Sequence, residues 1–237
     1  MKHIVSFSGG KDSTAMLLMM IEKGMHIDEI VFCDTTVEFP QMIEHISKVE
    51  NYIGRRITRL QAPFDFEYYL AYHVKVRGKN KGKKGYGFPN FRNRWCTGTL
   101  KKDVIRRHLK SYSYRTEYLG IAADEPNRIN KTKSTSKVTY RFPLYDWGIT
   151  EKKALQYCYS KGFDWGGLYE KFARVSCYLC PLQRIGGLRI IYNEFPELWE
   201  NMRRLDKLSY RQFKENYSID ELEKRFQREN QQTLLDI

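Results

Sequence analysis

The sequence lacks a long apolar run: the longest, from Ala15 to Ile21, is far shorter than the ~18 residues that a membrane-spanning helix needs. Cysteine is scarce, with five in 237 residues. This odd number argues against a disulfide framework and favours metal, cluster or free-thiol use. A strand-like run rather than a signal peptide follows Met1 and Lys2. With 41% hydrophobic residues, we expect one globular cytoplasmic domain, alone or with a small appendage, and neither a disordered, a fibrous nor a membrane protein.

Acidic residues are absent from Tyr68 to Lys102, in a chain whose net charge is +13. The cations of this segment are Lys75, Arg77, Lys79, Lys81, Lys83, Lys84, Arg92, Arg94, Lys101 and Lys102. One interpretation is a solvated, partly disordered loop, because such a stretch cannot bury itself. The other is an anion-binding flap at about residues 75–102, lying over a nucleotide or a polynucleotide. Its aromatic residues available to stack on bases are Tyr86, Phe88, Phe91 and Trp95.

Strand-like and helical patterns alternate in the first half of the chain. We expect strands at residues 3–7, 29–33, 56–60 and 117–121, and helices at residues 12–23, after Pro40 and at 99–109. Strands separated by helices predict a parallel sheet with right-handed crossovers. The expected fold is therefore α/β: three layers, with a mostly parallel sheet and helices on both of its faces.

The second half of the sequence is more helical. Thr150 is placed to cap a helix, Pro196 to begin another, and Ser218 with Glu221 to form a capping box before a third. We expect an α/β core at residues 1–150, including the basic flap, and a helical region at residues 151–237 that packs on the core.

Residues Ser8-Gly9-Gly10-Lys11-Asp12-Ser13 lie between the first expected strand and a strongly apolar helix. A Gly-Gly turn at this point presents backbone N–H groups, together with the positive end of the helix, to an anion. The loop is not a Walker A motif, because Lys11 is followed by Asp rather than by Ser or Thr. The alternative is an ordinary glycine-rich turn, which would need neither Lys11 nor the flanking serines. The motif predicts a phosphate site.

This loop resembles the pyrophosphate-loop signature of the adenine nucleotide alpha hydrolase superfamily. Further segments resemble the phosphoadenosine phosphosulfate (PAPS) reductase family within it, namely residues 33–38, 95–97 with Lys101, 120–128, 143–147 and 174–181. The resemblance implies a protein that binds ATP or a related adenine nucleotide and acts at its α-phosphate. Two departures shift the expectation from sulfate reduction toward cleavage of ATP between its α- and β-phosphates. Residues 226–237 lack the cysteine of the reductases' Glu-Cys-Gly motif, and the loop has the full form found in ATP pyrophosphatases.

For such a reaction we assign Gly9, Gly10 and the helix N-terminus to the pyrophosphate. Lys11 would neutralise the charge that develops on it, and Ser8 and Ser13 would hydrogen-bond phosphate oxygens. Asp12 is a candidate Mg²⁺ ligand. Its alternative role is that of an acidic residue stabilising the helix dipole.

Other candidates lie where strands are expected to end, at the edge where open α/β sheets bind ligands. Asp34 and Thr35 would recognise adenosine or its ribose, unless they cap the next helix. The segment that begins at Gly120 contributes to the same nucleotide site. In it, Asp124 and Glu125 would hold metal while Arg128, a further catalytic candidate, holds phosphate or sulfate. The alternative is a surface ion pair.

Cys177 and Cys180 are spaced to bind one metal centre, and the family resemblance places Cys96 near them as a third ligand. The combination resembles the branch of the family that binds a [4Fe–4S] cluster. A structural Zn²⁺ with a non-cysteine fourth ligand, or uncoordinated thiols, are the alternatives. Cys33 and Cys158 read as ordinary buried thiols.

Our leading hypothesis is an enzyme that uses ATP and Mg²⁺ to adenylate an acceptor for sulfur chemistry. A nucleic acid acceptor would explain the basic flap, and an electron or sulfur donor protein is a possible partner. A second hypothesis is a PAPS or adenylylsulfate reductase that uses an iron–sulfur centre. A third is a non-catalytic module that responds to a nucleotide or binds nucleic acid.

Overall fold

Five strands form one sheet in the computed structural model, which describes residues 1–175 and 177–235. They are β1 (Lys2–Ser6), β2 (Glu29–Asp34), β3 (Thr58–Gln61), β4 (Arg115–Leu119) and β5 (Val138–Arg141), in the order β3-β2-β1-β4-β5. The pairs β1–β2, β1–β4 and β4–β5 are parallel, and Ser6 is in register with both Val31 and Leu119. The carboxyl ends of the three central strands therefore meet at one edge of the sheet.

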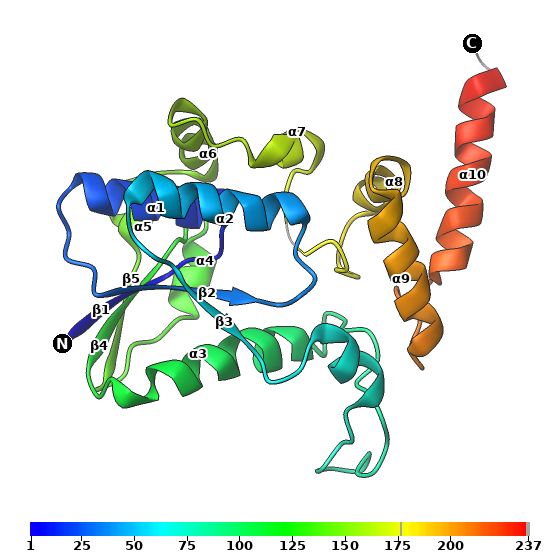
Figure 1. Ribbon diagram of the computed structural model, residues 1–237, viewed down its shortest axis with the longest axis horizontal. Coiled ribbons are helices and arrows are strands. Elements are labelled where there is room, and N and C mark those ends of the chain that lie inside the picture. Colours follow the sequence, from blue (N-terminus) through cyan, green and yellow to red (C-terminus); the bar gives the residue numbers. More distant parts are fainter. Residues whose placement is uncertain (176, 236–237) are drawn as a thin grey trace. The chain divides into compact units, whose positions relative to one another are not determined.

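Helices lie on both faces of this sheet (Figure 1). Helices α1 (Lys11–Glu22) and α2 (Pro40–Ile53) cover one face, and α3 (Asp103–His108) covers the other. Beneath α3, Ile4 and Val31 form a core cluster with Leu109 of the 3-10 turn Leu109–Ser111. This arrangement confirms the expected α/β fold with a parallel sheet between helical layers.

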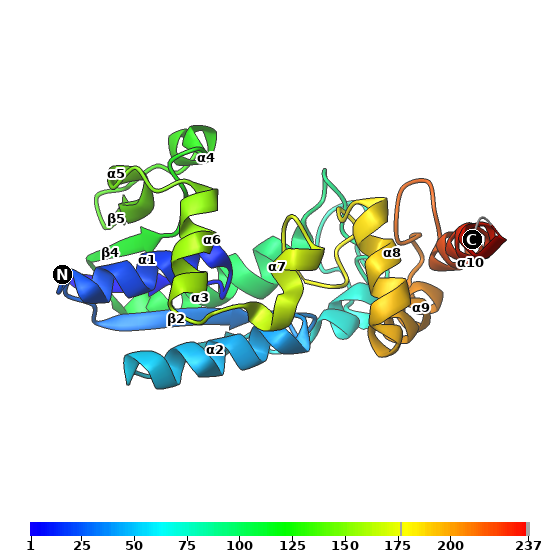
Figure 2. The ribbon, with the colours of Figure 1, turned by 90° about the horizontal axis from the view of Figure 1, so that it is seen from above.

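A second helix shields α1 from solvent. Helix α6 (Glu151–Ser160) packs beside α1 (Figure 2). Between them and the sheet, the α1 side chains from Ala15 to Leu18 and of Met20 are buried. This packing explains why α1 is apolar around most of its circumference. Shorter helical segments complete this part of the chain: α4 (Pro126–Asn130), α5 (Pro143–Asp146), the 3-10 turn Trp165–Gly167 and α7 (Leu168–Lys171).

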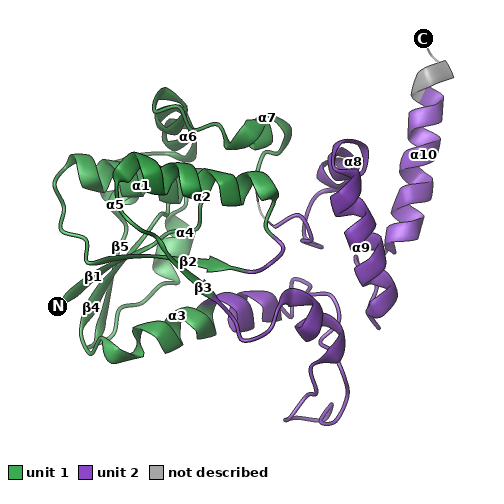
Figure 3. Ribbon diagram, in the orientation of Figure 1, with its two compact units in different colours: residues 1–34, 38–60, 102–175 green, residues 35–37, 61–101, 176–237 purple. Residues whose placement is uncertain are grey.

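The chain divides into two compact units that interleave along the sequence (Figure 3). Unit 1 contains residues 1–34, 38–60 and 102–175, and unit 2 contains residues 35–37, 61–101 and 176–237. These units differ from the division that we expect at residue 150, because residues 151–175 group with the sheet while residues 61–101 group with the C-terminal helices. The expected organisation, with a core at residues 1–150 and a helical region at residues 151–237 packed on it, stays a prediction.

Unit 2 is built mainly from helices. They are α8 (Ile185–Glu194), α9 (Pro196–Leu208), α10 (Ile219–Leu235) and the π-helical segments Tyr68–Tyr72 and Thr97–Lys102, the last of which ends at the boundary with unit 1. Rings of Tyr192, Trp199 and Phe226 pack together between α8, α9 and α10. None of the described helices combines the length and the apolar character needed to cross a membrane.

The local signals at helix ends are confirmed. The side chain of Thr150 accepts a hydrogen bond from Lys153 N, and Ser218 and Glu221 exchange the hydrogen bonds of a capping box. The helix expected at residues 99–109 is instead split into the π-helical segment, α3 and the 3-10 turn. Strand β5 has no counterpart in our expectations, because four residues at a sheet edge show too little alternation to be noticed.

Candidate functional site

The loop at residues 8–13 joins β1 to α1 and is folded by its own serines. Ser13 Oγ accepts a hydrogen bond from Ser8 N at 3.1 Å, lies 2.9 Å from Ser8 Oγ, and donates to Gly10 O at 3.0 Å. Gly9 has a φ of 77°. A Cβ atom there would lie 2.7 Å from Met42 Sδ, so the turn requires glycine for both its conformation and its space. The sequence therefore builds a tight, internally bonded turn in front of α1.

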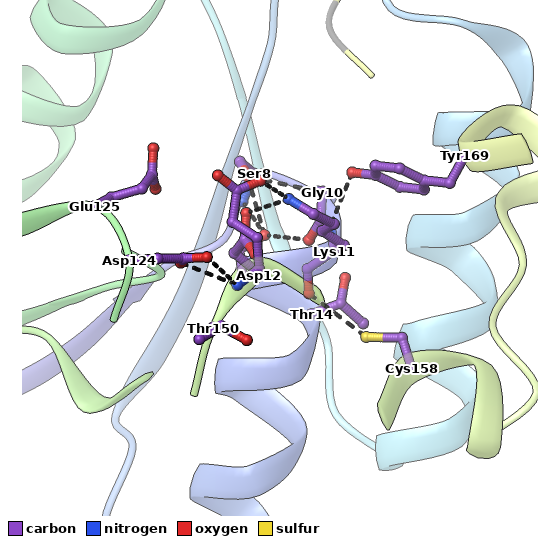
Figure 4. Close-up of polar contacts among 12 residues, drawn as sticks. Ser8, Gly10, Lys11, Asp12, Thr14, Asp124, Glu125, Thr150, Cys158 and Tyr169 are labelled. Atoms are coloured by element: carbon purple, nitrogen blue, oxygen red, sulfur yellow. Dashed lines mark hydrogen bonds and ion pairs between the residues drawn. The ribbon is translucent and has the colours of Figure 1, made fainter. Parts of the chain in front are cut away.

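Helix α1 begins without a side-chain cap, because Gly10 is its N-cap residue. The N–H groups of its first turn therefore receive no hydrogen-bond acceptor from the side chain of the N-cap residue. Tyr169 OH accepts the hydrogen bond of Lys11 N at 2.9 Å, whereas Gly10 N makes only a long contact of 3.4 Å to Ser8 Oγ (Figure 4). An anion at this point would meet backbone donors and the positive end of a helix.

Lys11 is 9% exposed and is held by two carboxylates. Its Nζ lies 2.5 Å from Glu151 Oε2 and 3.0 Å from Asp12 Oδ2. Burial acts to lower the pKa of Lys11, but the hydrogen bonds and charges of Glu151 and Asp12 outweigh it and leave that pKa raised. The side chain is therefore a cation at neutral pH.

Asp12 contributes only one oxygen to this ion pair. Its other oxygen, Oδ1, is buried without a hydrogen-bond partner among the described residues. Burial raises the pKa of Asp12, although the neighbouring Lys11 opposes the shift. A buried carboxylate oxygen that lacks a donor is suited to a cation or to a water molecule bound to one.

Trp165 supports the loop through a hydrogen bond to the Gly9 carbonyl group. Its indole Nε1 donates to Gly9 O at 2.7 Å, and its side chain is buried. The backbone of Trp165 has a φ of 54°, a left-handed conformation that a bulky residue rarely adopts. Such conformations cost about 1–3 kcal/mol and persist where the surrounding contacts enforce them. Here the bond to Gly9 provides such a contact at the loop of residues 8–13.

His45 links this support to helix α1. Its Nε2 lies 3.0 Å from Thr14 Oγ1, and its ring stacks on Trp165 with the centroids 4.3 Å apart. Burial lowers the pKa of His45 to about 3, with a smaller contribution in the same direction from the charge of Lys48. The imidazole is therefore neutral at physiological pH and acts as a packed hydrogen-bonding group.

Cys158 lies beneath the same loop. Its thiol donates to Lys11 O at 3.5 Å, and burial raises the pKa of Cys158 to about 12. The residue therefore stays a thiol and fills space under α1, as expected from its place on an amphipathic helix.

Gly120 brings the segment after β4 against the loop. A Cβ atom at Gly120 would lie 2.7 Å from Ser13 Cα and 2.8 Å from Ser13 N, so only glycine permits this approach. Further along, the Asp124 carboxylate accepts a hydrogen bond from Glu151 N at 3.1 Å and thereby satisfies a donor at the start of α6 (Figure 4).

Glu125 and Arg128 form an ion pair of 2.5 Å three residues apart, and the Arg128 side chain is more than half exposed. This geometry agrees with the alternative interpretation, in which the two residues form an ion pair at the surface. The catalytic role of Arg128 and the metal-binding role of Glu125 stay predictions.

Asp34 ends β2, at the same edge of the sheet as the loop at residues 8–13. It does not cap α2 and neither does Thr35, because the N-cap of that helix is Phe39. Thr35 belongs to unit 2, where its carbonyl accepts a hydrogen bond from Thr36 Oγ1 at 2.6 Å. Adenosine or ribose recognition by Asp34 and Thr35 stays a prediction.

Two of the four aromatic residues expected to stack on bases cannot do so. Phe88 is 0% exposed and Trp95 is 7% exposed, and the Trp95 indole donates to Gly87 O at 2.9 Å. Both rings form the core of unit 2, which the acid-free composition of the segment did not reveal. Tyr86 is partly buried, and Phe91 is 60% exposed.

The three candidate metal-binding cysteines all fall in unit 2. Burial raises the pKa of Cys96, and the nearby Cys180 adds to the shift. Among the residues that the structure describes, no group of three or more His, Cys, Asp or Glu has a metal-binding arrangement. The metal role of Cys96, Cys177 and Cys180 stays a prediction.

The sequence did not reveal the residues that are distant along the chain but support the loop and the start of α1: Tyr169, Trp165, His45 and Glu151. A local signal existed at Asp164-Trp165-Gly166-Gly167, where two glycines follow a tryptophan. The Asp164 carboxylate accepts from Gly166 N, and both glycines have positive φ. That string indicates a special turn, but it does not indicate what the turn contacts.

A parallel sheet with a glycine-rich loop between β1 and the N-terminus of α1 is an arrangement that commonly binds nucleotide phosphates in α/β proteins. Residues 2–183 match the phosphoadenosine phosphosulfate reductase domain. The chain belongs to this family.

Curated relatives include two proteins of Methanocaldococcus jannaschii. The chain is 28% identical over 238 residues to uncharacterized protein MJ0066, covering 92% of this chain and 43% of that protein. It is 27% identical to uncharacterized protein MJ0973, covering 82% of this chain and 45% of the relative. A nin region protein, ORF290 of Escherichia phage lambda, is 28% identical over 54% of this chain and 51% of its own length. The chain thus spans about half the length of these relatives.

Two solved structures are similar at low sequence identity. The phosphate complex of PAPS reductase from Candida auris has a TM-score of 0.49 at 14% identity, covering 70% of this chain and 76% of that one. The U34-tRNA thiolase NcsA from Methanococcus maripaludis, with its [4Fe-4S] cluster, has a TM-score of 0.45 at 16% identity, covering 87% and 72%.

Proposed function

We propose that this protein binds ATP through residues 8–13 and, with Mg²⁺, cleaves it between the α- and β-phosphates to adenylate an acceptor. The observation that carries the proposal is the start of α1: its N-cap residue Gly10 has no capping side chain, and its first residue is the buried cation Lys11. Backbone donors, a helix dipole and a fixed cation are the features that stabilise a pyrophosphate leaving group.

In the proposed step an acceptor oxygen attacks the α-phosphorus. The bond from that phosphorus to the bridging oxygen breaks, and pyrophosphate leaves with the electron pair. Lys11, whose pKa is raised, stays charged and can exchange a carboxylate partner for a phosphate oxygen. The hydroxyl groups of Ser8 and Ser13, 2.9 Å apart, keep the turn in the shape that presents its N–H groups.

The charges around the loop explain why a divalent cation would be needed. The carboxylates of Asp12 and Glu151 flank Lys11, and the charge of Glu125 acts on Asp12 as well. A polyphosphate placed there without a counterion would be repelled. Mg²⁺ is commonly held by one or two carboxylates together with substrate phosphates. The unpartnered Asp12 Oδ1 fits that role, with Glu151 as the second carboxylate. When bound, Mg²⁺ would neutralise charge on the phosphates.

The acceptor that we propose serves sulfur chemistry, on the strength of membership in the PAPS reductase domain family. The cations at residues 75–102 favour a nucleic acid acceptor, and a separate protein would donate sulfur or electrons. No step is assigned to an iron–sulfur cluster or zinc, because the described residues contain no metal-binding group of three or more His, Cys, Asp or Glu.

The test is product analysis of the purified chain with ATP and MgCl₂. With water attacking the α-phosphorus in place of the acceptor, we expect AMP and pyrophosphate rather than ADP and orthophosphate. Lys11→Ala should lower pyrophosphate release about a hundredfold, because it removes a charge-assisted contact to the leaving group. Lys48→Ala, which removes an exposed lysine of α2, is the matched control and should keep the wild-type rate. ADP as the product, or equal rates for the two variants, would contradict the proposal.

The family match favours a second candidate, a PAPS or adenylylsulfate reductase. It predicts release of sulfite from either nucleotide in the presence of a reductant, with no pyrophosphate from ATP. Anaerobic purification followed by iron, zinc and labile-sulfide analysis is the accompanying measurement. Stoichiometric iron and sulfide would support the cluster-dependent form, and ATP that binds but stays intact would support the non-catalytic module.

A further inference from the structure

Residues 73–85 of unit 2 form a closed hairpin, here called the basic hairpin. Gly85 N donates to His73 O at 2.9 Å, Lys75 N donates to Lys83 O at 3.0 Å, and Gly82 N donates to Lys75 O at 2.8 Å. Val74 and Lys84 form an antiparallel bridge. The backbone hydrogen bonds of this segment are therefore made within it, and its charged side chains are left at the surface.

Five cations of the basic hairpin are exposed: Arg77, Lys79, Lys81, Lys83 and Lys84. Within the described part of the chain, no carboxylate lies within 4.0 Å of any of them. The C-terminal helices of the same unit behave differently. Arg204 pairs with Glu67 at 2.5 Å, and Arg225 pairs with Glu229 at 2.8 Å. The charge of these five cations is thus not neutralised by a carboxylate of the described residues, and it suits an external polyanion.

An exposed aromatic ring lies beside Lys75, a further cation of the same hairpin. Tyr210 is 62% exposed, yet its hydroxyl donates to Tyr86 O at 2.8 Å and its ring lies 4.8 Å from Lys75 Nζ. The ring also packs close to Gly87, where a Cβ atom would lie 3.0 Å from two of its carbons. Tyr210 is therefore held in one position while much of its ring faces solvent. A fixed, exposed ring next to cations is the arrangement on which unpaired bases stack.

We propose that the basic hairpin and Tyr210 bind single-stranded nucleic acid, with phosphates on the hairpin lysines and a base on the tyrosine ring. A single strand is favoured over a duplex because only an unpaired base can stack on the ring. The inference rests on the proposed function only in identifying this strand as the acceptor, since the binding itself needs no ATP.

The experiment measures fluorescence anisotropy of the full-length chain with a labelled 20-nucleotide single strand, as RNA and as DNA, and with the DNA duplex. Binding of a single strand, RNA or DNA, tighter than the duplex is expected. The triple variant Lys79→Gln, Lys81→Gln, Lys83→Gln should weaken single-strand binding at least tenfold. It should also reduce the slope of log affinity against log salt by about 2, because each lost phosphate contact contributes roughly 0.7.

A matched triple variant removes the same charge elsewhere: Lys152→Gln, Lys207→Gln, Lys224→Gln, all at exposed helix positions. It should change binding less than threefold. Tyr210→Ala should weaken single-strand binding about tenfold, whereas Tyr210→Phe, which keeps the ring, should restore it. Melting temperatures of all variants establish that they are folded.

Equal weakening by the two triple variants would overturn the proposal, because net charge alone would then explain binding. Duplex binding that is as tight as single-strand binding, or an unchanged affinity of Tyr210→Ala, would overturn it as well. Lys11→Ala separates the two proposals. If that variant and the wild type bind the single strand equally well but neither yields pyrophosphate, the proposed reaction fails and the nucleic acid surface stands.

Discussion

Lys11 and the lysines of the basic hairpin have the same side chain in opposite surroundings. Lys11 is buried and contacts Asp12 and Glu151, while the five exposed hairpin cations have no carboxylate within 4.0 Å in the described part of the chain. A cation held by two fixed partners suits one small anion that replaces a partner at a defined position. Unpaired surface cations suit a long anion that contacts several of them at once. The size of an anionic ligand can therefore be inferred from whether the cations that bind it already form ion pairs within the protein.

The largest expected effect is that two variants each lose affinity for a different ligand: one for ATP, the other for single-stranded nucleic acid. Lys11→Ala should weaken ATP binding about a hundredfold and leave single-strand binding unchanged, because Lys11 supplies a charge-assisted contact at one point. The triple variant Lys79→Gln, Lys81→Gln, Lys83→Gln should weaken single-strand binding and leave ATP binding unchanged. Isothermal titration with ATP and anisotropy with the single strand measure both. If either variant weakened the binding of both ligands equally, ATP and the single strand would not have separate binding sites.

Next in size is Gly120→Ala, which tests the close approach behind the loop. The new methyl group would meet Ser13 backbone atoms at 2.7 Å and 2.8 Å. We expect a loss of about 1–3 kcal/mol of unfolding free energy, together with weaker ATP binding, measured by urea denaturation and titration. Gly186→Ala, at an open position of α8 with nothing within 4 Å, is the control and should be neutral or slightly stabilising. Wild-type stability and ATP affinity in Gly120→Ala would contradict this account.

The buried His45, which contacts helix α1 behind the loop, should make the unfolding free energy depend on pH. Its native pKa of about 3 lies below the ordinary value of 6.5. As the pH falls below 6.5, the unfolded chain binds a proton that the native state does not, so the unfolding free energy decreases. The slope approaches about 1.4 kcal/mol per pH unit for one proton. Urea denaturation at pH 7.0 and 5.5 should show a smaller loss for His45→Gln than for wild type. Equal losses would show that His45 is not the group responsible.

The smallest expected effect concerns the hydroxyl group that bonds Lys11 N. Tyr169 OH accepts that hydrogen bond at 2.9 Å, where a phosphate oxygen would otherwise bind. Tyr169→Phe should raise ATP affinity about threefold to tenfold, because the N–H group no longer has an internal partner to give up. Titration with ATP measures the change, and single-strand binding serves as the unaffected reference. A lower affinity would mean that the hydroxyl itself contacts the nucleotide.

Much of the fold could be predicted because its signals are local. The apolar circumference of residues 12–23 identified a buried helix, and Thr150 and Ser218 identified helix starts that the structure confirms. Strand β5 and the π-helical segments were not predictable. They depend on pairing with β4 and on packing, which leave little trace in four to six residues of sequence.

The candidate site divides in the same way. The loop at residues 8–13 is contiguous, so its glycines, lysine and serines were visible together. Its supports come from distant positions: His45 contacts Thr14 across 31 residues, Glu151 contacts Lys11 across 140, and Trp165 contacts Gly9 across 156. No local pattern marks such pairs, because only the folded chain brings them together. The buried Phe88 and Trp95 were misassigned to the surface for the same reason.

The bond from the Trp165 indole to Gly9 O also gives the molecule a built-in optical reporter. Indole emission responds to the hydrogen bonding and polarity around its nitrogen, and this nitrogen is fixed 2.7 Å from the turn that we assign to ATP. Any ligand that moves Gly9 will change the emission of Trp165. Occupancy of the loop can therefore be followed without a label, with Trp165→Phe defining how much of the signal comes from that ring.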